Sequence, residues 1–318
     1  MIQLDNCVRN LFFSLSIVSS TVFVPHHVFA AHHANSSVAI ETVDLGGRVM
    51  NGTHNKPGPG GLEVRLIPLG KAGVRTLGVT KTSNEGRFQF SNLKVPEGKG
   101  HVLLVTLYQG VPYIVMPRMG SRSNRLPIYA VGSDSSKVHV DSHQILVRVE
   151  KEKLVFRESL RLNNFGNTTY VSSGGGTLTF NLPRGAKLLQ FPEGLNQKLV
   201  KITSERIESS EPILPGTRQI NLIYSISSPS SKVSVERRMQ FHTKQFKVMT
   251  MEFGMREPIS SDLDYTGVFG EDLGDRFHVA AGGGFSRGKL VQFTISRDIR
   301  NASIEMIFLV FAGVVIVV

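Results

Sequence analysis

The sequence holds one cysteine, Cys7, and no tryptophan among its 318 residues. Cys7 lies in a segment that we expect to be removed on export, so the mature chain would contain no thiol. That absence excludes a disulfide framework, a cysteine zinc site and a cysteine nucleophile. It also suits an oxidising compartment, where a lone exposed thiol is a liability. Sugar sites commonly stack their ligand on exposed aromatic rings, above all tryptophan, so its absence argues against a carbohydrate ligand.

Acidic residues are fewer than basic ones. The chain carries 36 Lys and Arg against 25 Asp and Glu, a net charge of +11. A basic surface suits anionic partners such as phospholipid headgroups, phosphate-bearing envelope polymers or nucleic acid. A nucleic-acid site would need a basic stripe with interleaved aromatic residues, and the basic residues are instead spread over both halves. We therefore expect an anionic polymer or a protein as partner, and no nucleic acid.

The first 30 residues have the order of a secretory signal peptide. A polar start with Asp5 and Arg9 precedes a mostly apolar run over residues 11–24, and Val28, Ala30 and Ala31 are small or medium residues at the positions that signal peptidase requires. This order of charge, apolar run and small residues is typical of a cleaved export signal. We expect residues 1–30 to be a signal peptide and the protein to be exported; an uncleaved membrane anchor is the alternative.

Histidines follow the expected cleavage site. Cleavage after Ala30 would make Ala31 the new N-terminus and His33 its third residue. A free amine, two deprotonated amides and an imidazole form a square-planar nitrogen set that suits Cu(II) or Ni(II). Cleavage one residue away destroys this set, and histidines beside such a site are usually incidental, so we assign no metal here.

The other end of the sequence is apolar from Met306 to Val318. A membrane-spanning helix needs about 20 apolar residues, so this run is short for a complete span. We expect residues 304–318 to be a membrane-anchor helix, either truncated or accommodated by tilting and a thinner bilayer. A buried final strand is the alternative, because the last five residues are good strand formers.

Apolar residues alternate with polar ones in most clear segments between residues 41 and 300. Such alternation is what a strand with one buried and one solvated face requires. Two examples are Leu62, Val64 and Leu66, which alternate with Glu63 and Arg65, and the run Ile220, Leu222, Tyr224 and Ile226. Many short strands separated by turn residues predict an all-β protein of two consecutive β-sandwich domains, over residues 41–138 and 141–300. The polar segment 134–143 marks the expected boundary.

The first half resembles the carboxypeptidase regulatory-like domain. The likeness lies in Gly47–Thr53, in Leu62–Leu66, in Gly78–Leu93 and in the hairpin Tyr108–Tyr113. The resemblance implies a transthyretin-like sandwich, also grouped with starch-binding-like folds, in which residues 78–93 form a hairpin that turns at Gly86. Glycine suits the positive φ of such a turn, and Phe88 and Phe90 would then point together into the core.

In known families this domain is an accessory of zinc carboxypeptidases, receptor barrels or envelope proteins. The chain has no His-x-x-Glu pair, and residues 141–300 are too few for a receptor barrel. The second half resembles the domain that follows such sandwiches in some bacterial membrane-anchored proteins. The matching segments are Phe156–Asn164, Thr169–Tyr170, Asn181–Ala186 and Ile213–Thr217. The resemblance implies a tethered ectodomain without a known activity.

Catalytic patterns are incomplete in this sequence. Gly284–Gly288 matches the bare Gly-x-Ser-x-Gly elbow, but no histidine follows Ser286 and no helix is expected there, so a hairpin tip is the better interpretation. His139 and His143 would lie on one side of a strand about 13 Å apart at ~3.3 Å per residue. That is too far to share a metal, so we interpret them as surface histidines.

The sequence thus assigns no catalytic residue, no metal ligand and no cofactor, and it leaves the ligand-binding residues unknown. We expect a non-catalytic ectodomain on the periplasmic or extracellular face, tethered to the membrane, with a structural or protein-interaction role. Its partner would be an envelope protein or an anionic envelope polymer. The alternatives are a carbohydrate-binding module of starch-binding-like fold and an enzyme of unrecognised type.

Overall fold

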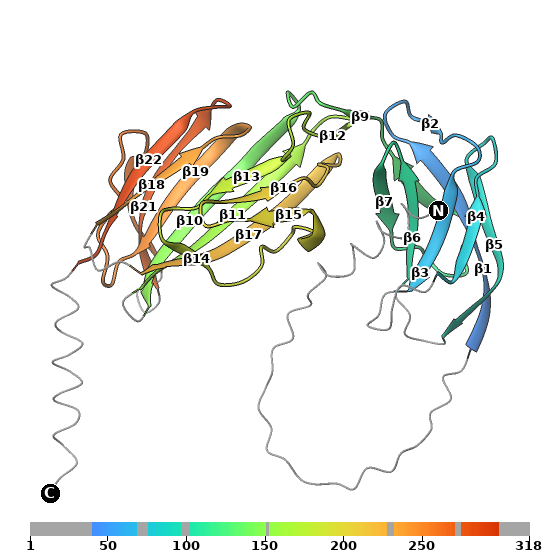
Figure 1. Ribbon diagram of the computed structural model, residues 1–318, viewed down its shortest axis with the longest axis horizontal. Helices are drawn as coiled ribbons and strands as arrows, with labels where there is room; N and C mark the ends of the chain where they lie inside the picture. Colours follow the sequence, from blue (N-terminus) through green and yellow to red (C-terminus); the bar gives the residue numbers. More distant parts are fainter. Residues whose placement is uncertain are drawn as a thin grey trace, which may run out of the picture. The chain divides into compact units, whose positions relative to one another are not determined.

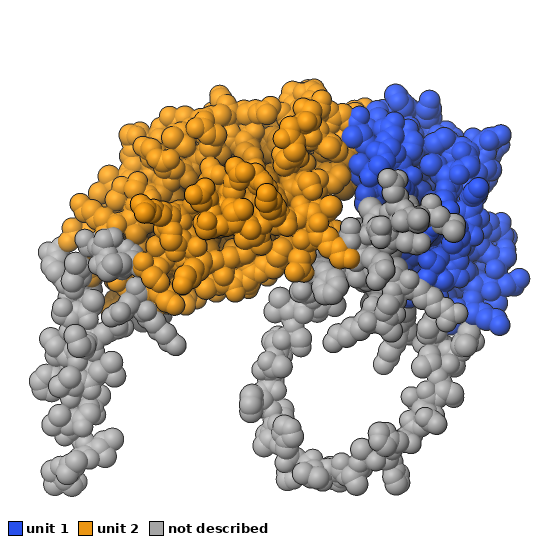
Figure 2. All heavy atoms as spheres, in the orientation of Figure 1, with its two compact units in different colours: residues 1–131 blue, residues 132–318 orange. Residues whose placement is uncertain are grey.

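The computed structural model describes residues 40–68, 76–96, 102–150, 153–227, 232–270 and 275–298. Within these ranges the protein is nearly all β, which confirms the predicted fold class at that level. The chain forms two compact units, residues 1–131 and 132–318 (Figures 1 and 2). The division lies just before the polar segment 134–143. The expected signal peptide and membrane anchor lie outside the described residues.

Unit 1 contains two four-stranded sheets. The strands of the first are β1 (Ile40–Asn51), its antiparallel neighbours β2 (Lys56–Pro57) and β5 (Arg87–Pro96), and the parallel β8 (Asn124–Ile128). Those of the second, antiparallel throughout, are β4 (Gly78–Lys81), β3 (Glu63–Pro68), β6 (Val102–Tyr108) and β7 (Val111–Val115). Both sheets contribute fully buried side chains to the core, among them Leu45, Leu66, Leu104 and Leu126.

The alternation predicted around Val64 is correct for the apolar residues of β3 but not for the polar residue between them. Val64 and Leu66 are buried as expected, but Arg65 is buried too, at 4% exposure, and its Nε donates to Glu63. The reason is that the opposite face of this sheet is also covered, with Ile67 and Val105 buried there. The prediction of a solvated face for β3 is therefore wrong.

The turn at Gly86 also differs from its prediction. Gly86 has φ +70, and Phe88 and Phe90 are both 4% exposed, as the pattern indicated. However, β4 pairs with β3 and β5 pairs with β1, so the turn passes the chain from one sheet to the other instead of closing a hairpin. By contrast, β6 and β7 do form the predicted hairpin, with Tyr108 opposite Val111.

Unit 2 is built on one seven-stranded sheet (Figure 1). Its strands in spatial order are β14 (Ala186–Leu188), β17 (Gly216–Ser227), β11 (Lys153–Asn164), β10 (Val138–Glu150), β19 (His242–Met251), β21 (Arg276–Phe285) and β20 (Asp264–Gly270). The smaller sheets contain β13 (Leu178–Asn181), β16 (Arg206–Ser209), β15 (Val200–Ile202), β18 (Lys232–Arg238) and β22 (Leu290–Ser296). Short elements complete it: β9 (Val131–Gly132) at the unit boundary, β12 (Thr169–Tyr170) and a 3₁₀ turn, Gln197–Leu199.

One face of the large sheet packs against the smaller sheets through a continuous apolar core. Phe156 and Val248 of the large sheet share this core with Phe180, Ile207 and Phe293 of the smaller ones. The run Ile220, Leu222, Tyr224 and Ile226 is buried throughout, which confirms its predicted alternation. In the part of the chain that is described, no helix is long and apolar enough to cross a membrane.

Candidate functional site

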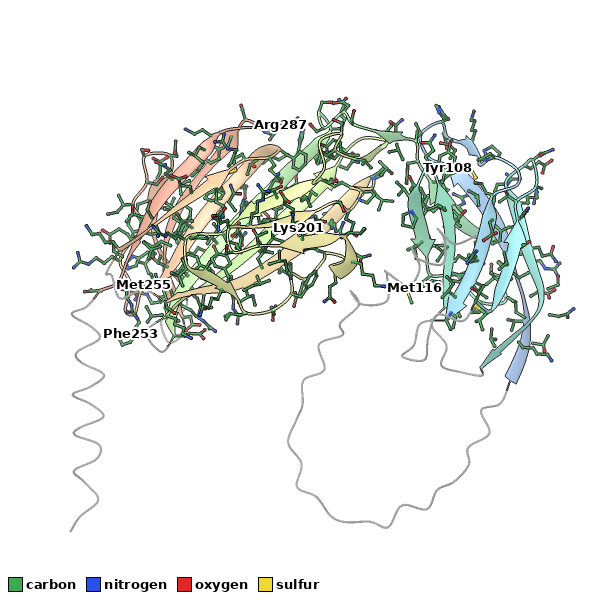
Figure 3. All side chains as sticks on the ribbon, viewed as in Figure 1. Tyr108, Met116, Lys201, Phe253, Met255 and Arg287 are labelled. Atoms are coloured by element: carbon green, nitrogen blue, oxygen red, sulfur yellow. The ribbon has the colours of Figure 1, made fainter. Side chains whose placement is uncertain are left out.

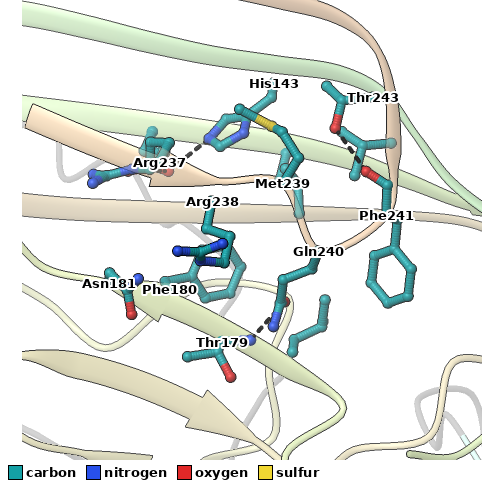
Figure 4. A pocket seen from close by; sticks show the side chains of 14 residues that line it. His143, Thr179, Phe180, Asn181, Arg237, Arg238, Met239, Gln240, Phe241 and Thr243 are labelled. Atoms are coloured by element: carbon teal, nitrogen blue, oxygen red, sulfur yellow. Dashed lines mark hydrogen bonds and ion pairs between the residues drawn. The ribbon is translucent and has the colours of Figure 1, made fainter. Parts of the chain in front are cut away.

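Four polar side chains meet inside the core of unit 2. His143 comes from β10, Glu158 from β11 and Tyr224 from β17, all in the large sheet, while Arg237 reaches across from β18. The side chains of Glu158, Arg237 and His143 are only 1%, 6% and 8% exposed. Figure 4 shows the surroundings of His143 and Arg237. We call these four residues the core polar cluster.

Glu158 is the centre of the core polar cluster. Arg237 Nε donates to Glu158 Oε1 at 3.0 Å and Arg237 Nη2 donates to Oε2 at 2.7 Å, a bidentate pair. His143 Nε2 lies 2.6 Å from Oε1, and Tyr224 Oη accepts from Arg237 Nη2 at 2.5 Å. Such charge-assisted, two-point pairs are stronger than neutral hydrogen bonds. The cluster therefore links the two layers of unit 2 by a buried ion pair.

The charge state of the core polar cluster follows from these contacts. Burial alone would raise the pKa of Glu158, but the charge of Arg237 and the hydrogen bond from His143 outweigh it and hold the pKa well below its usual range. Burial raises the pKa of Tyr224, and the charge of Glu158 raises that of Arg237 despite the burial of the guanidinium. Glu158 and Arg237 are thus charged and Tyr224 is neutral. A general acid or base needs a pKa near the working pH, so these three groups do not supply one.

A cavity of about 40 Å³ adjoins the core polar cluster. Thr179, Gln240 and Thr243 contribute to its wall, and Gln240 accepts a hydrogen bond from the Thr179 amide at 2.8 Å (Figure 4). A space of this size holds one or two water molecules, whereas sites for small organic ligands are several hundred Å³. The hydrogen bonds around this cavity are suited to stabilising the core.

A sequence signal for the core polar cluster exists, although the predictions above did not use it. Phe156, Glu158 and Leu160 recur at every second position, so alternation alone places Glu158 on a buried face. Val235 and Arg237 do the same in β18. Two opposite charges at core-facing positions of different strands must pair, because an unpaired buried charge is very costly.

The predicted placement of the two histidines on β10 is wrong. A β-bulge between Val140 and Ser142 adds one residue to the strand, so His139 and His143 face opposite sides of the sheet. His143 is buried in the core polar cluster, and its ring lies 4.8 Å from that of Phe246. The interpretation of His143 as a surface residue is corrected accordingly.

The turn that contains Ser286 also differs from the predicted hairpin tip. It follows β21, which pairs with β19, and precedes β22, which pairs with β18, so the turn joins two sheets and is no hairpin tip. Gly288 donates its amide to Met239 O at 2.7 Å, which fixes this turn to the neighbouring strand end.

A second candidate site lies on unit 1, in the segment 116–125, which we call the arginine loop; it follows β7 and includes the first two residues of β8. Its guanidinium groups belong to Arg118, Arg122 and Arg125, all exposed. Asn124 organises the loop: its Oδ1 accepts from the Arg118 amide at 2.7 Å, and its Nδ2 donates to the carbonyls of Arg118 (3.2 Å), Ser121 (3.1 Å) and Gly46 (3.0 Å). The loop is therefore held to β1 by hydrogen bonds.

The charges of the arginine loop are mostly uncompensated. Arg122 Nη2 pairs with Asp44 Oδ2 at 2.7 Å, but within the described ranges Arg118 and Arg125 have no carboxylate partner. Unit 1 as a whole has 13 Lys and Arg against 6 Asp and Glu, a net charge of +7, which is most of the +11 of the chain. The sequence shows that the chain is basic. It does not show that these three arginines lie on one ordered loop, because the hydrogen bonds from Asn124 that order the loop depend on the tertiary fold.

No family model matches the sequence, and no curated protein matches it. Among solved structures the chain is similar to a Parabacteroides distasonis protein provisionally described as a protease, with 11% identity over 51% of this chain and 40% of that chain at a TM-score of 0.30. It is also similar to the full-length major pilin SpaD from Corynebacterium diphtheriae, with 9% identity over 62% of this chain and 61% of the pilin at a TM-score of 0.21. The chain thus spans less than two thirds of either protein, and likenesses at these scores carry no argument about fold or function.

Proposed function

We propose that the protein is a non-catalytic, exported ectodomain that binds an anionic partner of the cell envelope through the arginine loop of unit 1. The partner is a phosphate-bearing envelope polymer or the acidic surface of an envelope protein. The observation that carries the proposal is the pair of exposed arginines, Arg118 and Arg125, without carboxylate partners among the described residues. A guanidinium binds phosphate or carboxylate through two parallel hydrogen bonds.

The rigidity of the arginine loop supports this role. Binding requires that mobile side chains and loops become ordered, and this ordering reduces affinity. The hydrogen bonds of Asn124, together with the bond from the Gly46 amide to Ser121 O at 2.9 Å, order this backbone before any partner arrives. Met116 at the start of the loop is 59% exposed (Figure 3). Methionine and arginine are both enriched in protein interfaces.

The wider setting of the proposal comes from the sequence. We propose that each unit is a β-sandwich domain, that the first is of the carboxypeptidase regulatory-like type, and that residues 1–30 direct export. Residues 304–318 would tether the protein to the membrane. Both terminal segments lie outside the described residues. The apolar character of their sequences is what supports this part of the proposal.

The test compares the full chain with the double variant Arg118→Gln/Arg125→Gln in binding to isolated envelope fractions. We expect the variant to bind at least about tenfold more weakly, a loss of about 1.4 kcal/mol. We also expect wild-type affinity to fall as salt rises past physiological strength, where the screening length is about 8 Å. The matched control is Arg157→Gln/Arg161→Gln, which removes two exposed arginines from β11 of unit 2.

Equal losses in the two double variants would mean that net charge, and not the arginine loop, governs binding, which would refute the proposed site. The second candidate function is carbohydrate binding, which the resemblance to starch-binding-like folds favours. A neutral glycan panel separates the two, because stacking of a sugar is nearly indifferent to salt. Tight, salt-insensitive binding to a neutral glycan would replace the proposal by this alternative.

A further inference from the structure

Two histidines far apart in the sequence face each other on unit 2. His139 of β10 and His242 of β19 are direct partners in the parallel register, so their side chains leave the same face of the sheet. Their ring centroids are 5.3 Å apart, with an interplanar angle of 72°. Neighbouring strands are separated by about 4.8 Å, and this close spacing holds the two imidazoles together.

The hydrogen bonding of His139 leaves one ring nitrogen available. Its Nε2 lies 3.1 Å from the carbonyl oxygen of Ser136, which can only accept, so Nε2 carries the proton. Nδ1 then has a lone pair, and it is buried without a hydrogen-bond partner among the described residues. A buried acceptor without a donor is costly. Metal-binding histidines have this arrangement, with one nitrogen donating to a carbonyl and the other on the metal.

We propose that His139 and His242 form a binding site for a late first-row divalent metal ion, with Zn²⁺ as the representative ion. Imidazole nitrogens suit this class of metal. Two nitrogens that each lie about 2.0–2.1 Å from one Zn²⁺ are at most about 4.2 Å apart. The ring centroids are 5.3 Å apart, so the site requires one nitrogen of each ring to turn toward the other, and His242 is only half-buried.

The surroundings of the histidine pair are compatible with a cation. The ring of Phe165 packs against His139 at 5.4 Å and shields it from one side. The nearby charge of Lys244 is offset by Asp141, whose Oδ1 lies 2.6 Å from its Nζ. No group of three or more His, Cys, Asp or Glu able to hold a metal occurs within the described ranges. The site therefore offers two protein ligands, with water at the other positions, and we expect weaker binding than at four-ligand structural zinc sites.

The test is a titration of the metal-free full chain with Zn²⁺ by isothermal calorimetry, with Co²⁺ absorption spectra as a second readout. We expect a binding event of one equivalent that weakens at least tenfold in His139→Ala and equally in His242→Ala, because each variant removes one of two protein ligands. The double variant, which keeps neither imidazole, should bind no more tightly than either single one. A ligand-field band of Co²⁺ that disappears in both single variants would assign the metal to imidazole nitrogens.

Two control variants exclude other histidines. His278→Ala removes a ring that instead bonds to the Tyr265 hydroxyl at 2.9 Å, and it should leave the binding event unchanged. His33→Ala removes the histidine of the possible N-terminal nitrogen set and should also leave it unchanged. Circular dichroism checks that each variant is folded, and His242→Asn replaces His242→Ala if the latter is not. Absence of binding by the wild type, or full binding by His139→Ala, overturns the inference.

Discussion

Removing the charge of Glu158 should destabilise unit 2 more than any surface substitution. The variant Glu158→Gln keeps the shape of the side chain but leaves the guanidinium of Arg237 buried and uncompensated. Unit charges about 4 Å apart attract by about 4 kcal/mol at an effective dielectric constant of about 20. Breaking one partner of a buried pair typically costs about 3–5 kcal/mol. We therefore expect a loss of about 4 kcal/mol, a large part of the usual stability of a domain.

The assay is unfolding of the full chain in urea, followed by circular dichroism. Glu252→Gln is the matched control in the same unit, because its ion pair with Arg276 at 3.0 Å is 39% and 46% exposed and such pairs contribute little. The double variant Glu158→Leu/Arg237→Met should be clearly more stable than Glu158→Gln, since no charge remains buried. A loss below about 1 kcal/mol in Glu158→Gln would refute the reasoning, because it would lie in the range of surface changes.

Three further predictions concern other parts of the chain. The pKa of Glu158 is lowered on folding, so its carboxylate contributes to the free energy of unfolding above the ordinary value of 4.5, and this contribution is lost as the pH falls below that value. The free energy of unfolding, measured as a function of pH, should therefore decrease toward acid pH in the wild type and decrease less in Glu158→Gln. Phe88 is 4% exposed in unit 1, and Phe88→Ala should cost about 3–5 kcal/mol in urea unfolding. A loss below about 1 kcal/mol would contradict its burial. Deletion of residues 304–318 should release the protein from sedimented membranes, and persistent sedimentation would favour an uncleaved N-terminal anchor.

Local alternation was sufficient to predict strands but not how they assemble. The run from Ile220 to Ile226 identified a strand with one core face because burial on a single face imposes a period of two. The same reasoning failed at Arg65, where a second covered face buries the residue between two core positions. It also could not show that the turn at Gly86 changes sheets, because both a hairpin and a crossing turn can require a glycine with positive φ.

The core polar cluster was predictable in part. Glu158 and Arg237 each stand at a position where the alternating strand pattern expects a buried apolar residue. The sequence therefore indicated that each strand would bury one charge. Which partner each would find was not readable, because they lie 79 positions apart and belong to opposite layers. The register that brings them together depends on the packing of the whole core.

The β-bulge in β10 determines the positions of the histidines in both the core polar cluster and the histidine pair. In a regular strand, His139 and His143 would lie on the same face, four residues apart. The extra residue at Asp141 turns the strand, so His143 enters the core beside Glu158 while His139 stays on the opposite face beside His242. A shift of one residue exchanges the two faces of a strand. The core polar cluster and the histidine pair therefore depend on the same bulge, and its removal should disrupt both.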